Sequence, residues 1–235
     1  AKEAQQGIGR YPHSEQIANL QRILGESYYY TSQYSKAADA FNQYLTSTNV
    51  PSREALYLLG LSYYETNVYS QAAETLGKVV SVNDALTQNA YLHLGFSYLQ
   101  LVEKNKARMA FEQASSSDYD LKVKEKALYN YALCIHETSY SAFGESVKVF
   151  ERFLNEFPSS VYAEKVSDYL VEVYMNSKSY AAALKSIEKI SRPSTRIMEA
   201  KQNVLFQLGT ESFANADFIK AIGYFDRSLE IGQYN

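Results

Sequence analysis

Several residues that commonly stabilise small proteins are scarce here, because the 235 residues include no Trp, one Cys and four Pro. The single cysteine, Cys134, excludes an internal disulfide framework and a thiolate metal cluster, and it is better explained as a small buried apolar residue than as a nucleophile. Apolar runs extend over only a few residues, so no membrane insertion is predicted. No signal peptide is recognisable, and a start at Ala1 rather than Met is compatible with earlier removal of a leader.

The chain also has no large excess of charge of one sign, since it contains 23 Lys and Arg residues and 26 Asp and Glu residues, and no basic run stands out. A balanced, slightly acidic chain argues against a nucleic-acid partner and against anionic membranes. The three histidines, His13, His93 and His136, lie far apart. The pair His136-Glu137 is not followed by the second His of a zinc motif, because Tyr140 stands in that place. We therefore expect no metal, no cofactor and no catalytic residues, and a protein that is not an enzyme.

What the chain does contain is a recurring pattern rich in its 22 tyrosines. The clearest copy is Tyr91-x2-Leu94-Gly95-x2-Tyr98-x8-Ala107-x3-Phe111. The small residue of the Leu-Gly pair recurs at Gly25, Gly60, Gly95, Ala132, Val171 and Gly209. A second small residue follows at Ala37, Ala72, Ala107, Ser146, Ala183 and Ala221, and four residues later a large apolar one at Phe41, Leu76, Phe111, Phe150, Ile187 and Phe225. A period of 35 to 39 residues predicts an array of structural repeats.

This pattern resembles the tetratricopeptide repeat (TPR), with Tyr91 in the place of the usual Trp. The resemblance implies an all-α fold, a right-handed α-α superhelix of about six helix-turn-helix repeats forming a single domain over 1–235. We place the repeats at about 18–51, 53–84, 88–119, 125–158, 164–193 and 202–231. Residues 1–13 are interpreted as the tail of a preceding repeat, so we expect the chain to be a segment of a longer array.

Apolar residues in each repeat recur at three- and four-residue spacing, which predicts two amphipathic helices per repeat. Pro51-Ser52 and Pro193-Ser194 predict two helix starts, because Ser is a favoured N-cap. A glycine inside a helix costs roughly 1 kcal/mol relative to alanine. We therefore expect the repeated glycines to serve close packing, each admitting the small residue of the second helix at the point where the two helices cross.

In TPR proteins, the face of the first helix next to this packing stripe lines a concave groove where ligands commonly bind. The resemblance therefore implies a partner-binding groove, and we expect it to be lined by Tyr29, Tyr57, Leu61, Tyr64, Leu92, Phe96, Leu99, Tyr129, Leu133 and His136. A mostly apolar groove suits an extended peptide or an amphipathic helix with apolar anchors. The alternative is that neighbouring chain covers these side chains. The predicted function is a non-enzymatic scaffold that binds an unidentified protein or peptide partner.

Other interpretations stay open at this stage. Residues 149–170, with Phe157-Pro158-Ser159-Ser160, are similar to units of bacterial envelope TPR proteins, namely outer-membrane-assembly lipoproteins and Tol-Pal coordinators. That resemblance favours the bacterial periplasm, whereas a lone cysteine keeps the cytoplasm as the alternative. The chain could instead be the non-catalytic arm of a larger enzyme or envelope complex, or an RNA-binding pentatricopeptide-like array. The last helix, near Phe218–Ile231, lacks an obvious solvating cap, which allows end-to-end self-association.

Overall fold

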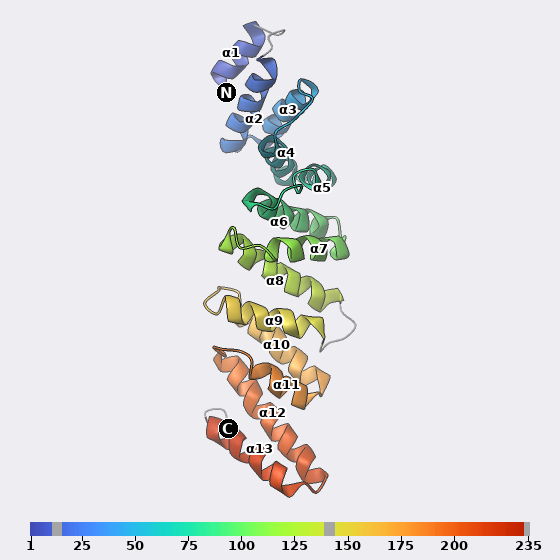
Figure 1. Cartoon of the computed structure of the whole chain (residues 1–235), viewed down its shortest axis with the longest axis vertical. Coiled ribbons are helices and arrows are strands. Elements are labelled where there is room, and N and C mark those ends of the chain that lie inside the picture. The colour runs from blue at the N-terminus through green and yellow to red at the C-terminus, as the bar shows by residue number, and fades with distance from the viewer. Residues whose placement is uncertain (11–15, 139–143, 233–235) are drawn as a thin grey trace. The chain divides into compact units, whose positions relative to one another are not determined.

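The computed structural model describes residues 1–10, 16–138 and 144–232, and these residues form thirteen α-helices and no strand (Figure 1). A short helix α1 (Lys2–Arg10) precedes six helix pairs. The first, or A, helices are α2 (Ile17–Tyr30), α4 (Arg53–Glu65), α6 (Ala85–Gln100), α8 (Leu121–Thr138), α10 (Ala163–Ser177) and α12 (Thr195–Ala214). The second, or B, helices are α3 (Tyr34–Thr46), α5 (Tyr69–Gly77), α7 (Lys104–Ser115), α9 (Glu145–Glu156), α11 (Tyr180–Ile187) and α13 (Phe218–Ile231). The predicted all-α fold of helix pairs is confirmed.

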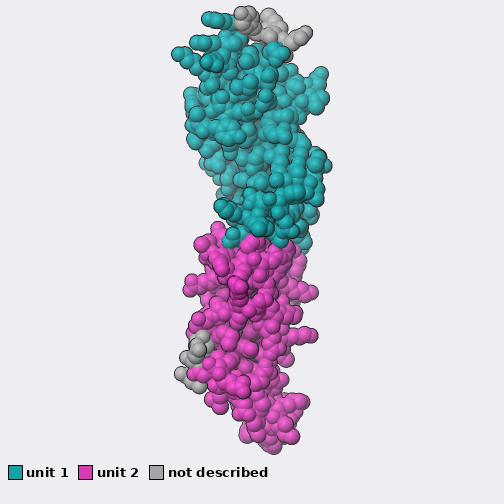
Figure 2. Space-filling view, turned by 60° about the vertical axis from the view of Figure 1, so that its left-hand side comes forward, with its two compact units in different colours: residues 1–127 teal, residues 128–235 magenta. Residues whose placement is uncertain are grey.

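The chain divides into two compact units, Ala1–Ala127 and Leu128–Asn235 (Figure 2). Within each unit, an A helix packs against its own B helix, and that B helix packs against the next A helix, as in the series α2, α3, α4, α5, α6. Successive A helices also touch, α2 with α4, α4 with α6, and α10 with α12. Each helix thus contacts its neighbours in sequence, which is the arrangement of a repeat array. The exact repeat boundaries and the single-domain description remain predictions.

Four of the repeated glycines lie in close contact with the B helix of their own pair. A Cβ atom added at Gly95 would lie 2.4 Å from Cε1 of Phe111, and one at Gly209 would lie 2.5 Å from Cε1 of Phe225. Gly25 stands in the same relation to Phe41, and Gly60 to Leu76. In all four pairs the contacting residue follows the glycine by sixteen positions. No side chain fits between these helices, so the glycine is required by packing.

The partner of the glycine differs from the one expected from the sequence. We expected it to admit the small residue of the B helix, such as Ala107, whereas the atoms nearest Gly95 all belong to Phe111. Ala107 and Phe111 are both fully buried. The large ring therefore lies directly over the bare glycine backbone, because a flat ring fills the space left by the missing side chain better than a methyl group does.

The turn between the two helices contains a left-handed residue in each of the five pairs whose turn the structure describes. Ser32, Asn67, Val102, Lys178 and Ala216 all adopt a left-handed backbone, with φ between 51° and 61°, and each follows the small residue of its A helix by seven positions. At Val102, the amide donates to the carbonyl of Leu99 at 3.0 Å, and the amide of Glu103 donates to that of Tyr98 at 2.9 Å. This pair of bonds is the Schellman C-cap, in which glycine is the favoured residue. The chain uses no glycine in any of these five turns.

In two repeats, a side chain near the start of the A helix forms hydrogen bonds with the loop that follows the B helix of the same repeat. Gln88 is buried, and its amide donates to the carbonyls of Ala114, Ser117 and Asp120 while it accepts from the amide of Asp120 at 2.8 Å. Arg53, at the same place one repeat earlier, donates to the carbonyl of Val79 at 3.0 Å. These bonds satisfy loop carbonyls that would otherwise be buried without partners.

Arg53 also forms a two-point ion pair with Asp84, the N-cap of α6, at 2.6 and 3.1 Å. The hydrogen bond from Arg53 holds the pKa of the Asp84 carboxyl well below its ordinary value. The two predicted serine caps are confirmed, since Ser52 Oγ accepts from the amide of Ala55 and Ser194 Oγ from the amide of Ile197. Residues 139–143, between α8 and α9, lie outside the described residues, while Arg192–Ser194 belong to the loop before α12.

Unit 2 contains a buried chain of three polar side chains, one each from α9, α10 and α11. Ser186 Oγ donates to Glu151 Oε1, and the Tyr174 hydroxyl lies 2.5 Å from Ser186 Oγ. Burial raises the pKa of the Tyr174 hydroxyl, so it remains protonated at neutral pH. Cys134 is buried as well, at 3% exposure, in agreement with a packing role. These groups sit inside the helix layers and serve the fold.

Replacing Gly95 with alanine tests the glycine contact. Alanine favours a helix by about 1 kcal/mol, yet its Cβ would overlap Phe111, so we expect Gly95→Ala to lower the free energy of unfolding by about 1–3 kcal/mol. The matched control is Gly77→Ala on α5, where an added Cβ meets nothing within 4 Å and stability should stay the same or rise. Urea denaturation followed by circular dichroism measures both. Equal effects of the two substitutions would contradict the close-contact explanation.

Replacing Val102 with glycine tests the turn. A β-branched residue in the left-handed region is strained, and Val102 is 78% exposed, so its side chain contributes little packing. We expect Val102→Gly to raise the free energy of unfolding by about 1 kcal/mol. Val161 is 88% exposed and has no positive φ, so Val161→Gly should lower stability slightly. Thermal melts of the two variants should shift in opposite directions.

Candidate functional site

The ten predicted groove residues lie on the A helices, and the structure buries three of them. Leu61, Leu92 and Tyr129 are at most 8% exposed, so they support the surface from below. The other seven, Tyr29, Tyr57, Tyr64, Phe96, Leu99, Leu133 and His136, are half-buried. Half-buried aromatic and aliphatic side chains are held firmly yet still offer contact area to a ligand. Their role in binding stays a prediction.

In unit 1, four rings from α4 and α6 form what we call the aromatic cluster: Tyr57, Tyr64, His93 and Phe96. The centre of the His93 ring lies 6.1 Å from that of Tyr57, 6.0 Å from that of Tyr64 and 6.4 Å from that of Phe96, all edge to face. Phe96 continues inward to Phe111, 5.2 Å away. The ring that covers Gly95 therefore also supports the floor of the cluster.

His93 was absent from the predicted groove, although it lies at the centre of the cluster. It is three residues before Phe96 on α6, and side chains at that spacing are neighbours on a helix surface. That spacing is the signal by which the sequence could have identified it. Burial lowers the pKa of His93 below its ordinary value of 6.5, and its Nδ1 lies 2.9 Å from the carbonyl oxygen of Asn89. The imidazole is therefore neutral at pH 7.

Two predicted groove tyrosines near the end of their A helices pack against the tyrosine that begins the following B helix. Tyr29 contacts Tyr34 edge-on at 5.5 Å, and Tyr64 contacts Tyr69 in the same way at 5.6 Å. In each case the second ring opens the B helix on the far side of the left-handed turn. Burial raises the pKa of the Tyr29, Tyr57 and Tyr64 hydroxyls, which keeps them protonated and able to donate hydrogen bonds.

Unit 2 has its own ring contacts, formed by α8, α9 and α10. Tyr129 stacks on Tyr162, with ring centres 4.2 Å apart and planes inclined by 15°. His136 lies 5.1 Å from the Tyr169 ring, and the exposed Lys165 ammonium lies over the same ring at 5.9 Å. Proximity to Tyr129 and Tyr169 raises the pKa of Lys165, so this amine is firmly cationic. An exposed cation beside half-buried rings suits a ligand with an acidic or aromatic group.

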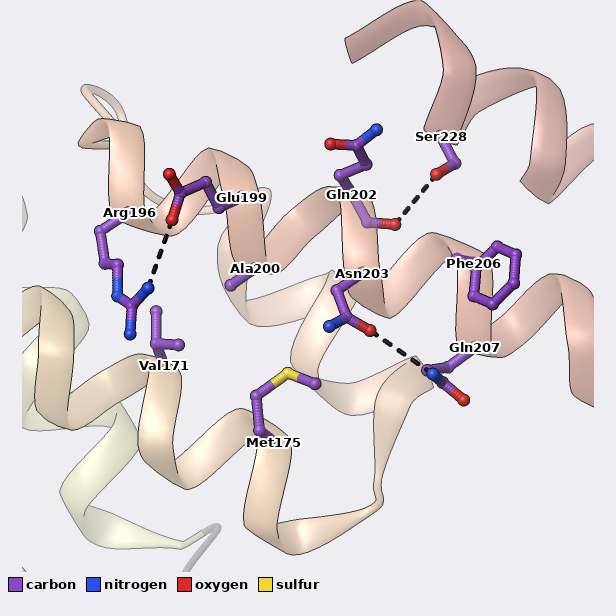
Figure 3. Close-up of a pocket in the computed structure, with 10 residues that line it drawn as sticks. All are labelled: Val171, Met175, Arg196, Glu199, Ala200, Gln202, Asn203, Phe206, Gln207 and Ser228. Carbon is purple, nitrogen blue, oxygen red and sulfur yellow. Dashed lines mark hydrogen bonds and ion pairs between the residues drawn. The ribbon is translucent and has the colours of Figure 1, made fainter. Parts of the chain in front are cut away.

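A cavity of about 880 Å³ lies between α10, α12 and the end of α13 (Figure 3). Met175 and Phe206 supply its apolar wall, and both occupy groove positions of their A helices. At one end, Arg196 lies 3.3 Å from Glu199 and 3.3 Å from Asp168. Asn203 and Gln207, one and two turns along α12 from Glu199, add two amide side chains to the lining.

Asn203 and Gln207 were not among the predicted site residues. They are four residues apart on α12, and the Gln207 amide donates to Asn203 Oδ1 at 3.5 Å. Amides both donate and accept, so they match the groups of a peptide backbone. Among the described residues, no cluster of His, Cys, Asp or Glu side chains could hold a metal ion. No helix in the described part of the chain is long and apolar enough to cross a bilayer.

Comparison with known proteins agrees with the helix-pair geometry. Residues 54–83, which contain most of α4 and all of α5, match the tetratricopeptide repeat family. No curated protein matches the sequence significantly.

Solved structures with a similar fold include two described as TPR proteins. A tetratricopeptide repeat protein from Parabacteroides merdae is 17% identical with a TM-score of 0.52, covering 98% of this chain and 85% of its own. YrrB, described as a TPR protein with an unusual peptide-binding site, is 14% identical with a TM-score of 0.58, covering 85% and 97%. The apo form of RapI is 14% identical with a TM-score of 0.52, covering 98% and 89%. The protein thus has the all-helical fold of tetratricopeptide repeat solenoids, and its second helix pair matches the repeat family in sequence.

Proposed function

We propose that this protein is a non-enzymatic scaffold that binds an apolar segment of a partner protein, either an extended peptide or an amphipathic helix. The observation that carries the proposal is the aromatic cluster of unit 1. Tyr57, Tyr64, His93 and Phe96 come from two adjacent helices and remain half-buried. Rigid rings with part of their surface open are typical anchors of protein interfaces.

The chemistry of the cluster defines what it would accept. At pH 7 the four rings carry no charge, because the tyrosines are protonated and His93 is neutral. A ligand would therefore present aliphatic or aromatic side chains to the rings, with the tyrosine hydroxyls left to bind its backbone carbonyls. YrrB, which has the same fold, has a peptide-binding site by its description, and this supports the proposed class of ligand.

A setting in bacterial envelope assembly is the finer form of this proposal. It rests on the similarity of residues 149–170 to units of envelope TPR proteins. In that setting the scaffold would hold partner segments while contributing no chemistry of its own.

The proposed groove is tested with random twelve-residue peptides displayed on phage, which serve as the probe. Selection on the wild-type protein should enrich peptides with aromatic or aliphatic anchors. The double variant Tyr64→Ala, Phe96→Ala should bind the enriched peptides at least about tenfold more weakly, because two anchoring surfaces are lost. Fluorescence anisotropy of the synthetic peptides measures the affinities.

The control is Tyr119→Ala, which removes an exposed tyrosine of unit 1 from the loop before α8. This variant should bind the peptides as the wild type does. Melting curves establish that all variants fold. Peptides that bind the double variant with wild-type affinity would overturn the proposed site.

The neutral state of His93 predicts a pH dependence of stability. Because burial lowers its pKa, the unfolded chain takes up a proton below about pH 6.5 while the folded chain does not, so stability falls as pH drops below that value. Glu65 opposes this shift and Lys126 adds to it. We expect His93→Phe to lose less stability than the wild type between pH 7.5 and 5, as measured by urea denaturation at each pH. Parallel curves would contradict a neutral, buried His93.

A further inference from the structure

A carboxylate lies at the end of α4, beside the aromatic cluster. Glu65 is the last residue of this helix, directly after Tyr64 and four residues after Leu61. Residues four apart are neighbours on a helix surface, so Glu65 shares the predicted groove face with Leu61. The residue is exposed, and its side chain makes no hydrogen bond or ion pair with any described residue. A partner therefore meets an unpaired negative charge at this edge of the cluster.

The charge of Glu65 acts on rings of three successive A helices. Burial is the main cause of the raised pKa of the Tyr29 and Tyr64 hydroxyls, a neighbouring tyrosine adds to the rise, and Glu65 raises it further. Burial lowers the pKa of His93, whereas Glu65 opposes that shift and Lys126 adds to it. Tyr29, Tyr64 and His93 belong to α2, α4 and α6. The carboxylate thus lies within electrostatic reach of all three rings.

Tyr29 extends the aromatic cluster towards α2. Burial raises the pKa of Tyr57 and the Tyr29 hydroxyl adds to the rise, so these two phenol groups are neighbours. Tyr57 and Tyr64 in turn meet His93 edge to face, with ring centres 6.1 and 6.0 Å from that of the imidazole. The three tyrosines are half-buried, and the face of a tyrosine ring attracts a cation. Tyrosine faces and the Glu65 carboxylate are therefore combined on one surface of unit 1.

The lysines of the chain do not occupy these rings. In other places, three lysine ammonium groups lie 5.5 to 5.9 Å from the centre of a tyrosine ring: Lys36, Lys106 and Lys165. No described residue makes a contact of this kind with Tyr29, Tyr57 or Tyr64. Tyrosine faces elsewhere in the molecule thus already have a cation, whereas a cation at these three rings would come from a partner.

The arginines on the first two A helices are engaged with other groups. Arg22 of α2 forms an ion pair with Glu26, one turn along the same helix. Arg53 pairs with the N-cap of α6, and it begins α4 whereas Glu65 ends it, so the two lie about 18 Å apart along the helix axis. Neither arginine therefore neutralises Glu65.

We propose that Glu65 and the three tyrosines bind a basic side chain, Lys or Arg, of the partner segment. This inference rests on the proposed peptide binding and names the chemistry of its ligand. The ammonium or guanidinium group pairs with the Glu65 carboxylate, and the apolar stem of the side chain lies on the rings of Tyr29 and Tyr64. The ligand is thus a segment in which a basic residue adjoins the aliphatic or aromatic anchor that packs on Phe96.

The same arrangement selects against acidic ligands. A carboxylate placed on these rings would meet the negative charge of Glu65 and the electron-rich faces of the tyrosines, and both contacts are repulsive. Each favourable contact of a basic group, the ion pair and the ring contact, changes affinity about two- to fivefold at an exposed site. Their sum amounts to about a tenfold preference for a basic residue over a neutral one.

The peptides enriched by phage selection on the wild-type protein serve as the probe. They should carry Lys or Arg next to an aliphatic or aromatic anchor. Replacing that basic residue with Gln should weaken binding to the wild type about tenfold, and Glu65→Gln should weaken binding of the parent peptide about fivefold. In Glu65→Gln the peptide substitution should cost much less than in the wild type, because the charge it pairs with is gone. Fluorescence anisotropy measures all four affinities.

The matched control is Asp39→Asn on α3, which removes the same charge from unit 1 at an exposed acid that also makes no hydrogen bond or ion pair with a described residue. This variant should bind the peptides as the wild type does. Raising the salt concentration from about 50 to about 500 mM should weaken binding to the wild type more than binding to Glu65→Gln. Melting curves establish that both variants fold, and the salt series on the wild type needs no variant at all.

Two results would overturn the inference: enriched peptides that carry no basic residue, and a basic residue whose loss costs the same in the wild type and in folded Glu65→Gln. If such peptides still bind the Tyr64→Ala, Phe96→Ala variant more weakly than the wild type, the proposed groove stands and only the basic ligand is wrong. A selection that enriches no peptide would overturn both proposals.

Discussion

The contact between a bare glycine backbone and a large apolar side chain sixteen residues later, which is a ring in three cases and Leu76 in the fourth, determines how these four pairs of helices pack. It sets how closely the A and B helices approach. In the third pair, the same ring also supports a side chain of the aromatic cluster. Phe111 covers Gly95 on one side and touches Phe96 on the other, so the floor of the aromatic cluster is built on the packing contact itself. Phe111 therefore contributes both to the helix packing and to the proposed binding surface. A substitution that shifts this ring should affect both.

Most of the fold could be predicted from the sequence because its repeating pattern is redundant. Small and large residues recur in register over six repeats, which leaves few alternatives to paired helices. The two Pro-Ser starts were predicted correctly because a capping serine acts locally. The partner of each glycine was not, because the choice between Ala107 and Phe111 depends on how two helices are rotated about their axes, and spacing alone does not specify rotation.

The candidate site was less predictable for a similar reason. Helical periodicity placed ten residues on one face, but it does not specify their exposure: Leu92 and Tyr129 are buried, whereas Phe96 is half-buried. His93 was missed because a lone histidine carries no motif. Its role became visible only when α4 placed Tyr57 and Tyr64 around it. The cavity of unit 2 needed three helices to define it.

The left-handed turns have a wider consequence for how the molecule tolerates heat. Five turns hold Ser, Asn, Val, Lys or Ala where glycine would relax the backbone, so the energetic penalty is distributed along the chain, one portion in each of the five repeats whose turn the structure describes. These turn residues lie in different repeats, at least 35 positions apart in sequence, and we expect their effects to add. Substitutions at the turns alone should therefore raise the melting temperature of the protein, without altering any surface proposed to bind a partner.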